Sequence, residues 1–240
     1  MYDLYANKHF SILGDSISSL EGYSEPRDSA FYDTEKKLAS GVITPPYTWW
    51  GKVIRRLGGT LLVNNSVSGS TVCWRRTYEI ESYACSDLRT SSLDKDGIAP
   101  DVIMVYMGTN DWGSGYPINH SEQIRSTAED RALFLGAYKL MLQKLRRNYP
   151  HAEIWCFTLP VSCCTAKTDF QFPYYYRGIH ISQYCDAIRT AAEEYGCRVI
   201  DLYKHARPYD TIDDFHANAS GMETLAESVL EALQASLKAD

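Results

Sequence analysis

The sequence predicts an α/β fold in which helices cover both faces of a parallel β-sheet. Short apolar segments typical of buried strands alternate along the chain with longer segments of helical apolar spacing. The most apolar segment, residues 102–107, shows no polar alternation, which is typical of a central strand buried on both faces. Several strands end in polar loops that contain glycine, and right-handed crossovers bring such loops to one edge of a sheet.

Five segments are predicted to be strands because apolar residues run together and stop at a turn signal. They are residues 12–13 (ending at Gly14), 60–63, 102–107, 153–159 and 198–202. Five further segments are predicted to be helices, all except residues 87–90 because their apolar residues recur three and four apart. They are residues 48–57, 87–90, 128–146, 182–195 and 219–237. The polar stretches 64–70, 108–111, 112–126 and 211–217 are predicted to be loops.

Two long segments, residues 17–46 and 160–179, are rich in aromatic residues and lack a clear period. Long loops of this kind are usually functional or disordered, and the aromatic content argues against disorder. We interpret the first as a structured flap near Ser16 that walls a substrate pocket; the alternative is that its aromatic rings only pin the loop to the core. We find no repeat and no interdomain linker, so residues 1–240 are predicted to form a single domain.

The composition argues against nucleic acid and membranes as partners. The 240 residues include 24 lysines and arginines and 30 aspartates and glutamates, giving a net charge of −6. No apolar run approaches the ~20 residues of a membrane-spanning helix. The sequence does not indicate an oligomeric state.

The cysteines and the N-terminus favour a cytoplasmic protein. Seven cysteines form an odd set without a Cys-x-x-Cys pair, which favours free thiols in a reducing compartment over a surface disulfide. The first residues, Met1 to Tyr5, lack the basic and apolar regions of a signal peptide. A leader removed beforehand would leave no trace in this sequence.

The tripeptide Gly14-Asp15-Ser16 follows the first predicted strand. One interpretation is a plain strand–turn–helix junction with a capped helix. The other is that Ser16 is a nucleophile at the carboxyl edge of the sheet. A serine hydroxyl is a weak acid, so this second interpretation requires a base and an oxyanion hole elsewhere in the chain. Asp15 is expected to serve the turn or the cap rather than the chemistry.

His216 is the best candidate for the base. It directly precedes the last predicted helix, and Asp213, three residues earlier, could accept a hydrogen bond from its ring. The alternative is that Asp213 or Asp214 merely caps the helix. The other histidines lack such a neighbour and are expected to be structural, with His205 the nearest rival. These are His9, His120, His151, His180 and His205.

Three groups are candidates for the oxyanion hole, namely the backbone amides of Ser16 and Gly69 and the side-chain amide of Asn110. Glycine at position 69 permits a close approach or an unusual backbone conformation. Asn110 offers a neutral donor that does not compete with His216 for a proton. The alternative for Asn110-Asp111 is a simple turn.

Four short blocks together resemble the sequence blocks of the SGNH (GDSL-type) hydrolases. In chain order they are Gly14-Asp15-Ser16, Asn65 to Gly69, Gly108-Thr109-Asn110-Asp111 and Asp213-Asp214-Phe215-His216. The resemblance runs from Phe10 to Met222. It implies a three-layer α/β/α sandwich with a flavodoxin-like, five-stranded parallel sheet, and a Ser-His-Asp esterase with no metal and no cofactor. The Gly-x-Ser-x-Gly elbow of the α/β-hydrolases is absent.

Carried over by position, the resemblance implies a role for each block residue. Ser16 would be the nucleophile and an oxyanion donor, and Gly69 and Asn110 would complete the oxyanion hole. His216 would act as base and then as acid, with Asp213 orienting it.

The substrate is predicted from the aromatic flaps. Aromatic rings suit stacking on sugar rings or on an aromatic acyl group, and we select Tyr23, Tyr32, Trp112 and Tyr175 as substrate-binding residues. The alternative is that these rings only pack against the protein, in which case they say nothing about the substrate. We expect the substrate to be a short-chain acyl ester, such as an O-acetylated carbohydrate. The alternatives are a lipase or acyl-thioesterase for longer chains, an acyltransferase with the same triad, and a non-catalytic carbohydrate-binding module.

Overall fold

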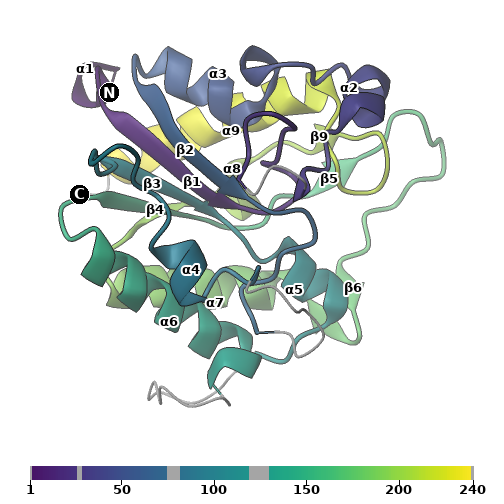
Figure 1. The fold of residues 1–240 in the computed structure, drawn as a ribbon. Helices are drawn as coiled ribbons and strands as arrows, with labels where there is room; N and C mark the ends of the chain where they lie inside the picture. Colours follow the sequence, from purple (N-terminus) through teal and green to yellow (C-terminus); the bar gives the residue numbers. More distant parts are fainter. Residues whose placement is uncertain (1, 26–28, 75–81, 119–129, 239–240) are drawn as a thin grey trace.

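The computed structural model describes residues 2–25, 29–74, 82–118 and 130–238, and its centre is a five-stranded parallel sheet (Figure 1). The strands lie in the order β2-β1-β3-β4-β8. Their bounds are β1 His9–Gly14, β2 Thr60–Ser66, β3 Val102–Tyr106, β4 Glu153–Phe157 and β8 Arg198–Ile200. Counted along the chain, this is the flavodoxin-like order 2-1-3-4-5, so the predicted fold class is confirmed.

Helices cover both faces of the sheet, as Figure 1 shows. Helices α3 (Trp49–Arg56) and α9 (Ala219–Leu237) pack together on one face, and α4 (Asp87–Thr90), α6 (Phe134–Asn148) and α7 (Ile181–Glu194) lie on the other. Every residue of β3 is buried, as its unbroken apolar sequence predicts.

The two long aromatic segments contain short elements that their sequence does not reveal. Helix α2 (Thr34–Ser40) lies within residues 17–46, and the 3-10 turn η2 (Pro45–Tyr47) begins there; the hairpin β6–β7 begins within residues 160–179 and ends at His180. The other short elements are α1 (Tyr2–Tyr5), α5 (Thr109–Ser114), η3 (Asp130–Ala132), α8 (Leu202–His205), the parallel pair β5 (Ser162–Cys163) and β9 (Tyr209–Asp210), and the hairpin strands β6 (Tyr175–Tyr176) and β7 (Ile179–His180). None of the described helices is both long and apolar enough to span a membrane. All seven cysteines lie among the described residues, and none of them forms a disulfide.

The helix predicted from Ala128 begins instead at Phe134, and residues 128–129 lie outside the described residues. Residues 130–132 form the separate 3-10 turn η3, so the predicted helix begins several residues too early. The start of α3 matches its sequence closely, because the Thr48 hydroxyl accepts a hydrogen bond from the Gly51 amide at 3.0 Å.

Strand β2 was predicted to end at Val63 but continues to Ser66. Its last three residues are polar, which is typical of a loop, yet all three are buried. The Asn64 amide donates to the Ser18 carbonyl at 3.0 Å, and the Ser66 hydroxyl donates to Asn64 Oδ1 at 2.5 Å. Because these polar side chains find hydrogen-bond partners inside the protein, they can be buried and the strand can continue past its apolar residues.

The segment after β3 was predicted to be a loop but forms helix α5. Gly108, with φ of +123°, turns the chain out of the strand, and Gly115, with φ of +66°, ends the helix. The helix buries only Asp111 and Trp112, which is too few residues for an amphipathic pattern.

The strand order creates a crevice at the carboxyl ends of β1 and β3. The chain leaves β1 for β2 on one side and later returns to β3 on the other side. Loops at such a switch point diverge and leave room for a ligand. Ser16 and Asn110 follow these two strands, so the topology places them on either side of the crevice.

We predict that Gly221→Ala destabilises the fold. A Cβ atom at position 221 would lie 1.9 Å from the Asp210 carbonyl oxygen of β9, so α9 would have to move outward. We expect the free energy of unfolding to fall by about 1–3 kcal/mol in urea titrations. The matched control is Gly113→Ala, whose Cβ would meet nothing within 4 Å. Equal urea midpoints for the two variants would contradict this packing.

Candidate active site

Ser16 lies just beyond the end of β1, with 7% of its surface exposed. The backbone at Gly14 leaves no room for a side chain, since a Cβ there would lie 2.5 Å from the Ser66 hydroxyl oxygen. The chain then turns sharply, and the Ser18 amide donates to the Asp15 carbonyl at 3.2 Å. Glycine at this point lets β1 and β2 remain close up to the residue before the turn.

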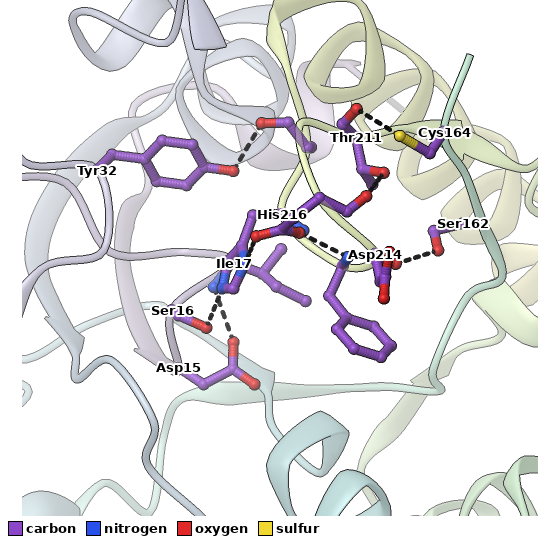
Figure 2. A network of polar contacts seen from close by, with 12 residues as sticks. Asp15, Ser16, Ile17, Tyr32, Ser162, Cys164, Thr211, Asp214 and His216 are labelled. Atoms are coloured by element: carbon purple, nitrogen blue, oxygen red, sulfur yellow. Dashed lines mark hydrogen bonds and ion pairs between the residues drawn. The ribbon is translucent and has the colours of Figure 1, made fainter. Parts of the chain in front are cut away.

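His216 and Asp213 complete a hydrogen-bonded row with Ser16. His216 Nε2 lies 2.8 Å from Ser16 Oγ, and His216 Nδ1 lies 2.7 Å from Asp213 Oδ2. Figure 2 shows His216 reaching from its loop to Ser16, which comes from the opposite end of the chain. With Nδ1–H donating to the carboxylate, Nε2 is free to accept the serine proton.

The loop that carries His216 is held in shape by its own backbone. The Ile212 amide donates to the His216 carbonyl at 2.9 Å, and Asp213 Oδ1 accepts hydrogen bonds from the amides of Phe215 and His216 at 2.8 and 2.7 Å. Burial alone would raise the pKa of the Asp213 carboxyl, but the hydrogen bonds from the His216 ring and these amides outweigh it and lower the pKa to about 2. The carboxylate is therefore ionised at neutral pH and can stabilise a protonated imidazole.

Phe31 fixes the plane of the His216 ring. The two rings stack with centroids 3.4 Å apart and an interplanar angle of 8°. Phe31 itself is held by its backbone amide, which donates to the Ser19 hydroxyl at 2.7 Å. The flap of residues 17–46 therefore contributes to the site by restricting the rotation of His216.

Gly69 and Asn110 lie around the same point as Ser16. Gly69 has φ of +73° in a turn closed by the Ser70 amide and the Val67 carbonyl at 3.1 Å. The Asn110 amide donates to the Ser70 carbonyl at 2.9 Å. This bond ties the loop after β3 to the loop after β2, so the two candidate oxyanion donors have a fixed spacing.

These residues line one cavity of about 300 Å³. Its described lining is Ser16, Ile17, Gly69, Thr109, Asn110, Gly113, Ser114, Tyr176, Phe215 and His216. A larger cavity of about 850 Å³ lies along β8. The larger one is lined by paired charges, Arg189 with Asp201 and Arg198 with Glu153, so we attribute the chemistry to the smaller cavity, which holds the serine and its base.

Comparison with known families decides which group of proteins this is. A family model of GDSL-like lipases and acylhydrolases matches residues 8–160. The chain belongs to the GDSL-like lipase/acylhydrolase family. The family prediction from the four sequence blocks is thus confirmed, and the protein is a GDSL-type acylhydrolase. Asp213 and His216 lie beyond the matched residues, so their place in the site depends on the geometry above.

Solved structures match this chain over nearly all of its length. Proteins assigned as GDSL-like lipases from Bacteroides ovatus and Bacteroides uniformis are 26% and 28% identical, with TM-scores of 0.72 and 0.71. They cover 96% and 98% of this chain and 99% of their own. Est24, a carbohydrate acetylesterase from Sinorhizobium meliloti, shares the fold at 14% identity, with a TM-score of 0.63 and coverage of 95% of this chain and 99% of its own.

A curated relative matches only a short stretch. The cellulase/esterase CelE of Acetivibrio thermocellus is 32% identical over 62 residues, which is 26% of this chain. The matched stretch is 6% of the length of CelE.

Two of the substrate-binding residues selected from the sequence are not available to a substrate of this acylhydrolase. Tyr32 is 0% exposed, and its hydroxyl donates to the Ala217 carbonyl at 2.7 Å. Trp112 is 1% exposed and packs against Phe172 and Tyr176. Both predictions are corrected, because these aromatic rings serve the core behind the site.

The other two selected residues are exposed, Tyr23 by 47% and Tyr175 by 64%, and neither is among the residues that line the described cavity. The structure instead brings Tyr176 and Phe215 to the cavity. Because neighbouring residues of a strand face opposite sides, only one of Tyr175 and Tyr176 could face the cavity, and the sequence alone does not say which.

The remaining histidines lie away from Ser16 in the described structure. His9 lies 3.4 Å from Asp101, and His180 caps α7 by accepting the Ser182 amide. His205 lines the cavity along β8, and His151 is exposed between α6 and β4. His120 lies outside the described residues.

Asp15 is buried under the turn that carries Ser16 and contacts both this turn and Asn110. Its carboxylate is fully buried, accepts the Ile17 amide at 3.0 Å and lies 3.4 Å from the Asn110 amide nitrogen. Burial raises the pKa of Asp15 to about 7, although the Ile17 hydrogen bond opposes the rise. The carboxyl therefore orients neighbouring groups.

We predict that Asp15→Asn weakens the pH dependence of stability. The folded protein holds the Asp15 proton up to a pKa of about 7, whereas the ordinary value is 3.8. Between these values the folded state binds more protons, so stability falls as the pH rises. The urea midpoint of the variant should therefore fall less between about pH 5 and about pH 8 than that of wild type.

The control for this experiment is Asp96→Asn, at an exposed aspartate, which should follow the wild-type curve. Parallel curves for Asp15→Asn and wild type would contradict the assignment of this pH dependence to Asp15.

Proposed function

We propose that this acylhydrolase cleaves carboxylic esters by a Ser-His-Asp triad through an acyl-enzyme intermediate. The observation that carries the proposal is the unbroken row of hydrogen bonds from Asp213 through His216 to Ser16. A serine hydroxyl needs a base within hydrogen-bond distance, and the base needs a group that sets its tautomer. Both requirements are met beside a cavity that can admit an ester.

In the first step, Ser16 Oγ attacks the ester carbonyl carbon while His216 Nε2 takes the hydroxyl proton. The carbonyl double bond opens to an oxyanion, and the protonated imidazole is stabilised by the ionised Asp213. Collapse of the tetrahedral intermediate breaks the bond to the alcohol oxygen, which takes the proton from His216. In the second step, water gives its proton to His216, attacks the acyl-serine carbonyl and releases the acid, and the proton returns to Ser16 Oγ.

The oxyanion would form among three donors, the amides of Ser16 and Gly69 and the side chain of Asn110. The Asn110 amide donates one hydrogen to the Ser70 carbonyl at 2.9 Å and the other to Asp15 Oδ2 at a longer 3.4 Å, and it lies on the cavity surface with Gly69. The oxyanion would take the place of the longer of these two bonds. Donors fixed before the reaction stabilise the developing charge without the cost of reorganising solvent.

We further propose a short acyl group, with an O-acetylated carbohydrate as the leading substrate. Ile17 is the one aliphatic side chain in the described lining of the cavity, and much of the rest is glycine, serine and threonine. A long alkyl chain would lie against polar groups there. Tyr176 offers an aromatic ring at the cavity, and the structural neighbour Est24 is a carbohydrate acetylesterase.

The triad is tested by Ser16→Ala and His216→Ala with p-nitrophenyl acetate, butyrate and octanoate. We expect kcat to fall by at least ~10³-fold in both variants, because each loses the proton transfer. Activity should be highest on acetate. The matched control is His205→Ala, which removes a histidine from the β8 cavity and should retain wild-type turnover. Equal activity in wild type and Ser16→Ala would overturn the triad, and a preference for octanoate would overturn the short acyl group.

The position of the acyl group is tested by Gly113→Val. Gly113 lines the cavity from α5, and its backbone leaves open space for a side chain. We expect kcat/KM for butyrate to fall at least ~10-fold more than for acetate, as expected when methylenes lose their pocket. An equal loss on both esters would show that this side of the cavity does not hold the acyl chain. Gly113→Ala serves as the intermediate size.

A further inference from the structure

Arg89 is a buried guanidinium beneath the candidate site. It lies in α4, is 2% exposed, and every nitrogen of its guanidinium donates a hydrogen bond. Nε donates to Asn65 Oδ1 at 2.5 Å; Nη2 donates to the carbonyls of Gly14 at 2.9 Å and Asn65 at 2.8 Å. Nη1 donates to the Ser70 hydroxyl at 2.9 Å and to the Ser82 carbonyl.

Such a cation is costly to bury, so its position needs a reason. Burial lowers the pKa of Arg89 to about 9, and the charge of Asp15 partly opposes this. The side chain is still protonated at neutral pH. An apolar side chain would be cheaper to bury in this four-residue helix. The arginine differs from an apolar side chain in the hydrogen bonds that its guanidinium donates to the surrounding loops.

The partners of Arg89 belong to the loops that supply the oxyanion donors. The Gly14 carbonyl is two residues before Ser16, and the Ser70 hydroxyl belongs to the residue after Gly69. The Ser70 carbonyl accepts the Asn110 amide. Ser16 and Gly69 are therefore linked to Arg89 through a residue one or two positions away in the chain, and Asn110 is linked to it through Ser70.

We propose that Arg89 is a positioning residue that sets the spacing of the oxyanion hole. The inference builds on the proposed function, because it concerns the same donors. The planar fork of the guanidinium holds the end of β1 and the turn 67–70 at one distance, and a lysine cannot reproduce this fork. Displacing donors by a fraction of an ångström weakens the transition state while leaving the substrate's binding contacts in place.

The experiment compares Arg89→Lys and Ser70→Ala with wild type. Ser70→Ala keeps the carbonyl that binds Asn110 but removes the hydroxyl that binds Arg89. Competent sites are counted by titrating Ser16 with a fluorophosphonate, and kcat and KM for p-nitrophenyl acetate are then expressed per titrated site. The matched control is Arg189→Lys, which weakens a partly buried arginine–aspartate pair near β8, away from Ser16.

We expect kcat per site to fall at least ~10-fold in Arg89→Lys, and less in Ser70→Ala, with KM unchanged. The rate of Ser16 phosphonylation should fall in the same order, because the tetrahedral adduct also needs the donors. Arg189→Lys should lower the urea midpoint without changing kcat per site. An Arg89→Lys protein with normal kcat per site, and only fewer competent sites or a lower urea midpoint, would overturn the inference.

Added guanidinium gives a second readout. In Arg89→Ala, millimolar guanidinium chloride should restore part of kcat per site, whereas urea and sodium chloride should not. Restoration of kcat by all three additives, or by none of them when the variant is folded, would count against the inference.

The labelling experiment separates the inference from the proposed function. Slow phosphonylation of Arg89→Lys supports the inference even if wild type hydrolyses none of the esters tested. A wild-type protein that is neither labelled nor active would overturn the proposed function and the inference with it.

Discussion

The parallel pairing of β1 with β3 is the constraint on which the rest of the site depends. In the register of these strands Gly14 lies opposite Tyr106, so the turn with Ser16 and the turn with Asn110 leave the sheet side by side. The chain enters β2 on the far side of β1, which adds the turn with Gly69 to the same edge. His216 then needs only a loop before α9 to reach Ser16. Four segments far apart in the sequence meet because the strand order reverses at β1.

Polar loops at a sheet edge are rigid only if their backbone groups find partners, and here buried acidic and basic side chains provide them. The carboxylate of Asp111 accepts the amides of Val72 and Cys73 at 2.8 and 3.0 Å, and Asp15 accepts the amide of Ile17. Arg89 binds the carbonyls of the same region. The two aspartates thus accept hydrogen bonds from backbone amides, and the arginine donates hydrogen bonds to backbone carbonyls. Loops held in this way can keep their shape when a substrate replaces water in the cavity.

The sequence predicted the sheet, the helices and the family because those signals are local. Apolar runs, Gly turns and short polar blocks can each be found within a few residues. It did not predict that Asn64 to Ser66 continue a strand, since the side-chain partners of Asn64 and Asn65 come from distant segments. Tyr32 and Trp112 looked like surface aromatics because loop residues are usually exposed, but tertiary packing buries both. Arg89 carried no signal at all, because a single arginine on a short helix is ordinary until its partners are known. The roles of Ser16, His216 and Asp213 stay predictions, although the structure places their side chains in one hydrogen-bonded row.

The correction at Trp112 bears on substrate choice after all. Its ring lies edge-on to Tyr176 and Phe215, with centroids 4.8 and 5.9 Å away, and it stacks on Phe172 at 5.3 Å. Tyr176 of β6 and Phe215 of the loop before α9 are two walls of the cavity, and they are about forty residues apart in the sequence. The indole packs against both walls, and closely packed aromatic rings resist displacement. Tyr176 and Phe215 also pack against each other, with centroids 6.3 Å apart, so the two walls and the indole form one aromatic cluster. If the enzyme prefers a small acyl group, the packing of this buried cluster would contribute to that preference together with the lining itself.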